Sequence, residues 1–326
     1  MQICEDMFTP RLACRALFVA AVTAILFGGA PAQAETLFVG PRETYKAPSD
    51  AARVAKPGDV VKIAPGTYFD CAVWMTDNLT IEGSGPGAVL TDRICQGKAI
   101  FVIHADNVTV RNLTFRRARA GDGNGAGIRA EGGNLTVENS RFFNNQSGLM
   151  AGDLPNSIIT VRNSEFYHNG TCVQSCAHAV YVGHIAQLKI DHSSFFETLV
   201  AHHIKSRARS TILTDNHIQD GPDGTASYEI DIPNGGSVVA TGNVIEKGPN
   251  NQNHKAAIMI GEEGASQPSK ELLFKDNQFV NDGPSPFYFL IRTIFVRNLT
   301  SSPAQLVGNR LKGWNVKALA GPGTVH

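Results

Sequence analysis

The chain has 326 residues, of which 29 are basic and 29 acidic, so its formal net charge is zero. This balance excludes the strong positive field with which proteins attract nucleic acids and anionic membrane surfaces. Gly is abundant, with 32 residues, and aromatic residues make up only 8%, a composition typical of many short strands and turns.

The N-terminus has the features of an export signal. Arg11 and Arg15 precede an apolar run at 16–30, and the small-residue sequence "AQA" follows it. This pattern predicts a signal peptide over residues 1–34, cleaved after Ala34, and a secreted or periplasmic protein. The run is short for a membrane span and no later apolar stretch is long enough, so we expect no span in the mature chain.

Four cysteines remain after the predicted cleavage: Cys71, Cys95, Cys172 and Cys176. Four cysteines allow three pairings, and proximity in the sequence favours Cys71–Cys95 and Cys172–Cys176 in an oxidising compartment. A zinc site at "CVQSC" is the alternative. It is less favoured, because no second closely spaced cysteine pair accompanies it.

The segment 45–68 predicts an amphipathic helix with Ser49 as its N-cap, then a Pro-Gly-Asp turn and a strand. A helix at this point would cover the open end of a stack of strands, which otherwise exposes its core and its strand edges. Residues 35–77 are therefore expected to form an N-terminal cap and the first strands.

An internal repeat organises the rest of the chain. Alternating apolar residues, a polar turn and a further apolar residue recur in "VTVRNLTF" (108–115), "LTVENSRF" (135–142) and "ITVRNSEF" (159–166). The copies are 23 to 34 residues apart, which indicates a solenoid, because propeller blades need about 40 residues. A parallel β-helix fits, with equivalent residues of neighbouring coils stacked on one another. The Asn residues after the strands should occupy turns and form a hydrogen-bonded ladder: Asn112, Asn139, Asn163, Asn216, Asn243 and Asn277.

A second strand follows the first in each coil, for example at 179–184, 201–206 and 227–232. With the N-terminal helix, "AKPGDVVKIAPGTY" and coils such as "NLTVENSRF", the chain resembles the right-handed parallel β-helix proteins of the pectin lyase-like superfamily. The resemblance implies an all-β, single-stranded right-handed parallel β-helix over residues 35–326. Its regular coils would span 78–280 and irregular C-terminal coils 281–326.

The resemblance is specific for the fold and weak for the reaction. The superfamily includes pectate, alginate and chondroitin lyases, polygalacturonases and mannuronan epimerases, as well as members with no known activity. The catalytic motifs of the polygalacturonases, of the epimerases and of the main pectate lyase family are absent from this sequence. No catalytic assignment therefore transfers residue by residue.

Two neighbouring second strands carry a dense group of charged residues. If the isoleucine at the centre of each strand points inward, alternation places four charged side chains outward. In that register His203 faces Glu229 and Lys205 faces Asp231, across one coil spacing of about 4.8 Å. Cross-strand ion pairs are common and contribute only about 0.2–1 kcal/mol each, but the density of this group favours a functional site.

The neighbouring residues extend the candidate site. His202 and Tyr228 are expected to point inward or to lie at a corner. The further catalytic candidates are Tyr181 and Arg207. The candidates for substrate binding are His178, His184, Arg129 and Glu262.

Such a cluster suits the β-elimination of a uronate polysaccharide, which needs a cation for the carboxylate, a base for the C5 proton and an acid for the leaving oxygen. His203 is the preferred base, because an opposing Asp231 would raise the pKa of Lys205. Lys205 or Arg207 would pair with the substrate carboxylate, and Tyr181 would supply the acid.

The carboxylates allow two other interpretations. Glu229 and Asp231 together could hold a Ca²⁺ ion that bridges to the substrate. They could also act as an inverting hydrolase pair, since positions two apart on a strand lie about 6.5–7 Å apart. A non-catalytic solenoid that binds a glycan or a protein of the cell envelope is the third hypothesis. The expected partner is an acidic polysaccharide, and the expected state is a monomer.

Overall fold

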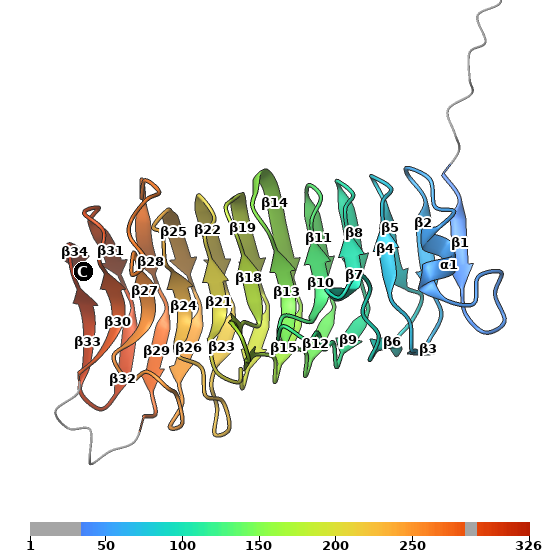
Figure 1. Ribbon diagram of the computed structural model, residues 1–326. Helices are drawn as coiled ribbons and strands as arrows, with labels where there is room; N and C mark the ends of the chain where they lie inside the picture. The colour runs from blue at the N-terminus through green and yellow to red at the C-terminus, as the bar shows by residue number, and fades with distance from the viewer. Residues whose placement is uncertain (1–33, 284–291) are drawn as a thin grey trace, which may run out of the picture. The chain divides into compact units, whose positions relative to one another are not determined.

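The computed structural model describes residues 34–283 and 292–326, and the predicted signal peptide lies outside these residues except for Ala34. Residues 34–326 form one unit in which successive coils each add a strand to three parallel sheets (Figure 1). The predicted all-β parallel β-helix is confirmed. In the part of the chain that the structure describes, no helix is long and apolar enough to cross a membrane.

The three sheets run in chain order along the coils. The first sheet consists of β1 (Thr36–Val39), β2 (Val60–Ile63), β5 (Thr80–Gly83), β8 (Val108–Arg111), β11 (Leu135–Glu138), β14 (Leu154–Arg162), β19 (Ile185–Asp191), β22 (Ser210–Thr214), β25 (Ser237–Thr241), β28 (Leu272–Lys275), β31 (Ala304–Val307) and β34 (Gly323–Val325). The second sheet consists of β4 (Ala72–Trp74), β7 (Ala99–Ile103), β10 (Ala126–Ala130), β13 (Ser147–Ala151), β18 (Val180–Val182), β21 (His202–Ser206), β24 (Tyr228–Ile232), β27 (Ala256–Ile260), β30 (Thr293–Asn298) and β33 (Val316–Ala320). The third sheet consists of β3 (Gly66–Tyr68), β6 (Ala88–Thr91), β9 (Thr114–Arg116), β12 (Arg141–Phe143), β15 (Glu165–Tyr167), β20 (Ser194–Phe196), β23 (His217–Gln219), β26 (Val244–Lys247), β29 (Gln278–Asn281) and β32 (Arg310–Gly313).

The N-terminal helix is shorter than the sequence pattern suggests. Helix α1 (Pro48–Ala52) packs on β1 and β4. Its N-cap is Ala47, so the prediction of Ser49 as the N-cap is wrong. The carboxylate of Asp50 instead accepts a hydrogen bond from the Ala47 backbone N–H at 3.0 Å, which satisfies one of the free donors at this end.

Both predicted disulfides are present, Cys71–Cys95 and Cys172–Cys176. The second closes a small antiparallel hairpin formed by β16 (Thr171–Cys172) and β17 (Cys176–Ala177). The alternative of a zinc site at "CVQSC" is thereby excluded. At the other end of the chain, where irregular coils were predicted, β30 to β34 continue the three sheets in register.

The predicted stacking of equivalent residues forms the core. The rings of Phe142, Phe166 and Phe195, one per coil on the third sheet, are fully buried. Neighbouring rings in this row are parallel, with centroids 4.6 and 4.7 Å apart. The apolar alternation of the repeat thus becomes a continuous core that runs through all coils.

The predicted polar ladder also exists, but it uses only some of the predicted Asn residues. Asn112, Asn139 and Asn163 take the left-handed conformation of the turn, with φ between 46 and 60°. The buried ladder lies one position further along the chain. There the side-chain oxygen of each residue accepts a backbone N–H of the preceding coil, in the order Ser140, Ser164, Ser193, Asn216, Asn243, Asn277 and Asn309.

The Asn243→Ala variant tests the ladder. Asn243 accepts the Asn216 backbone N–H at 3.0 Å and donates to the Leu213 carbonyl at 2.9 Å, and all of these groups are buried. Truncation leaves both backbone groups without a partner, so we expect a loss of about 2–4 kcal/mol in the free energy of unfolding by denaturant titration. The exposed Asn156→Ala should change it by less than about 0.5 kcal/mol, and an equally small loss for Asn243→Ala would refute a stabilising ladder.

Candidate functional site

One column of side chains runs along the outer surface of the second sheet. Strand register places these residues side by side on consecutive coils, from β10 to β30: Arg129, Met150, Tyr181, Lys205, Asp231, Met259 and Arg297. The predicted pairing of Lys205 with Asp231 is confirmed, with 3.1 Å between Lys205 Nζ and Asp231 Oδ2. The centre of this column, together with residues that follow β21 and β27, forms the candidate site.

A carboxylate from the turn after β27 completes an ion network at this centre. Glu263 Oε1 lies 2.7 Å from Lys205 Nζ, and Glu263 Oε2 lies 2.6 Å from Nη2 of Arg207. Arg207 also donates through Nε to the Tyr181 hydroxyl at 3.3 Å and through Nη1 to Asn234 Oδ1. We call Tyr181, Lys205, Arg207, Asp231 and Glu263 the outer cluster.

Three rings stack beside the outer cluster. His178, His202 and Tyr228 occupy consecutive coils, with centroid distances of 4.9 and 5.2 Å. The Tyr228 backbone N–H donates to His202 Nδ1, so Nε2 of His202 carries the proton and faces Asp231 Oδ2 at 3.4 Å. Burial, assisted by the charge of Lys205, lowers the pKa of His202 to about 3, and the ring is therefore neutral. His202 and Tyr228, which were expected to point inward or to lie at a corner, are the first residues of β21 and β24 and lie beside the outer cluster.

Asp231 has the electrostatic character of a proton acceptor. Burial raises its pKa to about 6, although Lys205 acts in the opposite direction. Its Oδ2 contacts Lys205 and His202, whereas its Oδ1 is buried without a hydrogen-bond partner. A carboxylate whose pKa lies near neutral pH is suited to proton transfer.

The predicted outward orientation of His203 and Glu229 is wrong, because both side chains are completely buried. The alternation of inward and outward side chains fails at the start of these strands. There, two successive residues of each coil face the core. The pairs Ile100–Phe101 and Ala257–Ile258 occupy the same positions in other coils and are also fully buried. His203 and Glu229 do meet, as predicted, but inside the solenoid.

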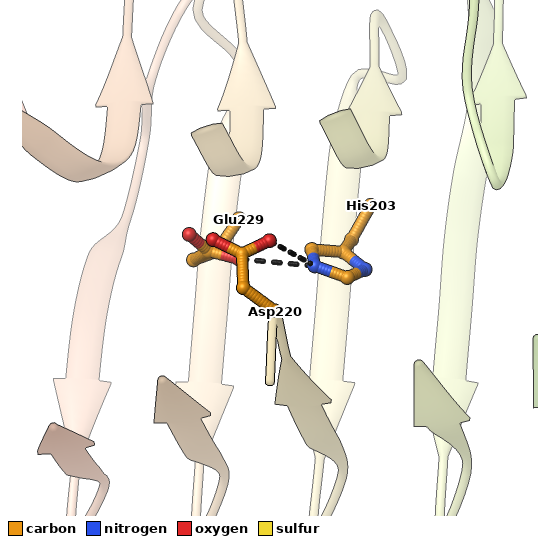
Figure 2. A group of neighbouring side chains, drawn as sticks. All are labelled: His203, Asp220 and Glu229. Carbon is orange, nitrogen blue, oxygen red and sulfur yellow. Dashed lines mark hydrogen bonds and ion pairs between the residues drawn. The ribbon is translucent and has the colours of Figure 1, made fainter. Parts of the chain in front are cut away.

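These two residues belong to a buried tetrad completed by Asp220 and Lys247. His203 Nε2 lies 3.1 Å from Asp220 Oδ1 and 3.2 Å from Glu229 Oε2. Figure 2 shows the three side chains converging from β21, β24 and the residue after β23. Lys247 Nζ lies 3.1 Å from Glu229 Oε1, and all four side chains have no exposed surface. We call these four residues the inner tetrad.

The charges of the inner tetrad balance when His203 is protonated. Burial acts to lower the pKa of His203, but hydrogen bonds to Asp220 and Glu229 outweigh it and raise the pKa to about 9. The protonated ring then lies between the carboxyl groups of Asp220 and Glu229, while burial acts to raise the pKa of Glu229. The Nδ1 atom of His203 lies 2.8 Å from the Thr198 hydroxyl, so both ring nitrogens have partners.

The inner tetrad is also the place in the described part of the chain where ligand atoms for a metal ion converge, from His203, Asp220 and Glu229. A divalent ion there would add a second positive group beside Lys247 and would displace the proton of His203. The charge of Lys247 therefore fits the protonated tetrad better than a metal centre. The predicted Ca²⁺ pair of Glu229 and Asp231 is not formed, because Glu229 contacts the tetrad and Asp231 contacts the outer cluster.

Three predicted substrate-binding residues lie around the outer cluster. Arg129 is in the outer column and pairs with Glu131 at 3.2 Å. Glu262 accepts a hydrogen bond from the Tyr228 hydroxyl at 3.0 Å. His184 pairs with Asp153 at 3.0 Å in the turn after β18.

Sequence reasoning missed three residues of the two clusters: Glu263, Asp220 and Lys247. Asp220 and Lys247 could have been found, because each stands two positions after the core isoleucine of a third-sheet strand. Glu263 carried no such signal. It lies in the sequence "GEEG", which comes after a repeated strand, and only Glu262 of this segment was predicted to belong to the site.

Comparisons with known proteins support the fold. Residues 69–200 match the family model described as right handed beta helix region. The solved pectate lyase Pel9A is 14% identical, with a TM-score of 0.57 over 87% of this chain and 78% of that one. An alginate lyase from Paenibacillus sp. is 16% identical, with a TM-score of 0.49 over 87% and 99% of the two chains. No curated protein sequence matches, and at these identities the likeness is one of fold.

Proposed function

Because the chain is a right-handed parallel β-helix protein of the pectin lyase-like type, we propose that it is an exported enzyme that cleaves an acidic, uronate-containing polysaccharide by β-elimination at the outer cluster. The observation that carries the proposal is the arrangement of Lys205 and Arg207 as a pair of cations beside Asp231, a carboxylate with a pKa of about 6. The two disulfides favour an oxidising compartment.

Lys205 and Arg207 neutralise the C6 carboxylate of the sugar. Loss of the C5 proton places negative charge on this carboxylate, and two fixed cations stabilise that charge where it develops. Arg207 is oriented in advance by Tyr181 and Asn234. Lys205 contacts two carboxylates, Asp231 and Glu263, and we assign it the role of a cation and not that of the base.

Asp231 accepts the C5 proton, in place of the buried His203. The C5–H electron pair forms the C4=C5 double bond as the C4–O bond breaks, and the Tyr181 hydroxyl protonates the leaving oxygen. Tyr181 and Asp231 flank Lys205 on the preceding and following coils. They are thus separated by two coil spacings, about 9–10 Å between backbones, which leaves room for a sugar ring.

The alternative of an inverting hydrolase requires Glu229 and Asp231 as its pair of carboxylates. It is not favoured, because Glu229 is buried in the inner tetrad. A binding solenoid without catalysis remains the outcome if no product forms. The pectate lyase with the same fold acts, by its name, on a uronate polymer, which supports this class of substrate for the first screen.

The screen uses purified protein with polygalacturonate, alginate and glucuronate-containing polymers, each with and without Ca²⁺. We expect ultraviolet absorbance from the unsaturated product to rise together with reducing ends, and to be lost in Lys205→Ala. Reducing ends without absorbance would indicate hydrolysis. Neither signal from folded protein on any of these polymers would overturn the lyase proposal.

A further inference from the structure

We propose that the Glu263 carboxylate is an internal occupant of a carboxylate subsite formed by Lys205 and Arg207, and that an acidic sugar binds by displacing it. The inference takes its class of ligand from the proposed function, but it concerns binding and not turnover. It assigns Glu263 a role that neither the repeat nor the fold implies.

The contacts of Glu263 are those that a bound carboxylate would make. Each of its oxygens has its own cation, Lys205 Nζ at 2.7 Å and Arg207 Nη2 at 2.6 Å. Such charge-assisted contacts are short and strong, and a guanidinium beside an ammonium defines the direction of the carboxylate plane. A uronate carboxylate of the same size fits between the same two cations.

The subsite does not depend on Glu263 for its shape. Without Glu263, Lys205 still pairs with Asp231 at 3.1 Å, and Arg207 still contacts Tyr181 and Asn234. Among the ion pairs of these two cations in the described residues, the one between Lys205 and Asp231 then remains, and Arg207 is left without a carboxylate in direct contact. A preorganised site with one uncompensated positive charge favours one carboxylate ligand.

Glu263 itself is attached in a way that permits displacement. Its side chain is 44% exposed, whereas those of Lys205 and Arg207 are 12% and 18% exposed. The turn is flanked by Gly261 and Gly264, both with positive φ, and space for a Cβ at Gly264 is open. Rotation of the Glu263 side chain returns a half-hydrated carboxylate to water at low cost.

The backbone of the turn can stay in place while the side chain moves. The Glu263 N–H donates to the Pro233 carbonyl at 3.0 Å. Further along, Gln267 Nε2 donates to the Arg207 carbonyl at 2.6 Å. These bonds hold the turn over the cations, so that Glu263 competes with the ligand at high effective concentration.

The test compares binding of a short galacturonate oligomer with binding of its fully methyl-esterified form, by calorimetric titration at low ionic strength. Removing the occupant raises the fraction of protein with a free subsite. If Glu263 occupies it about nine-tenths of the time, Glu263→Gln should bind the acidic oligomer about tenfold more tightly. Binding of the ester should not change.

Glu271→Gln is the matched control, because it removes one negative charge from an exposed position on the next segment, and it should leave both affinities unchanged. Lys205→Met in the Glu263→Gln background should abolish the gain. Thermal unfolding of each variant checks the fold. A further variant, Glu263→Asp, keeps the charge but shortens the reach and should give an intermediate affinity.

Unchanged or weaker binding of the acidic oligomer by folded Glu263→Gln would overturn the inference, as would an equal gain for the ester. Absence of binding in both the parent protein and the variant would overturn it too. Product formation is measured separately, so a binding gain without unsaturated product would support the subsite and refute the lyase.

Discussion

Lys247→Met should lower the free energy of unfolding by about 3–5 kcal/mol, the usual cost of removing one partner of a buried ion pair. Lys247 has no exposed surface, and its Nζ contacts Glu229 Oε1 at 3.1 Å and the Ser227 carbonyl at 2.9 Å. The substitution keeps the apolar stem but removes the cation at Oε1 of the buried Glu229, so that His203 is left as its cationic partner. Denaturant titration at neutral pH measures the loss.

The pH dependence of this variant follows from Glu229. Burial raises the pKa of Glu229, with the charge of Asp220 adding to the effect, and Lys247 is one of the contacts that oppose it. Without Lys247 one of these opposing contacts is lost, so the pKa of Glu229 in the folded state rises further above its value in the unfolded chain. The folded state then binds more protons than the unfolded state, so the stability of the variant should fall as the pH rises.

Two control variants distinguish the effect of breaking the buried ion pair from the effect of removing any lysine. Lys275→Met replaces a half-exposed lysine on β28 and should change stability by less than about 0.5 kcal/mol. The double variant Glu229→Gln with Lys247→Met removes both charges and should be more stable than Lys247→Met alone. If the double variant were the less stable of the two, the charge of Glu229 would not be the cause.

The sequence was sufficient to predict the coils and one pairing in the outer cluster. Phe142, Phe166 and Phe195 recur at a constant place in the repeat, and stacking is the way in which such residues bury themselves in a solenoid. The same repeat set the register that brings Lys205 against Asp231. Both features depend on spacing, which a repetitive chain displays directly.

The interior location of His203 and Glu229 could not be derived from alternation. Their column holds Gly127, Gly148 and Ala257 in other coils, small residues beside the large rings of the third sheet. A Cβ on Gly127 or Gly148 would meet a phenylalanine ring at 2.7 Å. The small residues were a signal that this column faces inward.

The change of residue type in that column coincides with a change in the opposite sheet. The phenylalanine row is interrupted after Phe195 by Ile218 and Ile245, and resumes at Phe279. Smaller side chains on the third sheet accompany longer, charged ones on the second. The space for a side chain such as His203 or Glu229 therefore depends on residues of two sheets. The sequence pattern of a single strand does not contain this information.

Asp231→Asn should reduce the rate of product formation by about 10²–10⁴-fold, the usual contribution of a general base. The amide keeps the size of the side chain but cannot accept the C5 proton. In the parent protein the rate should fall as the pH drops through about 6, because protonation of Asp231 removes the acceptor. Initial rates of ultraviolet absorbance over a range of pH, on the polymer identified by the screen, measure both effects.

Asp276→Asn is the matched control, since Asp276 is 58% exposed and lies in a left-handed turn that Asn also accepts. It should retain the parent rate and pH profile. Binding of the acidic oligomer should survive in Asp231→Asn, because Lys205 and Arg207 are unchanged, so the loss should appear in kcat and not in affinity. A folded Asp231→Asn variant with a rate near that of the parent would remove Asp231 as the base. A parent rate that does not fall as the pH drops through about 6 would lead to the same conclusion.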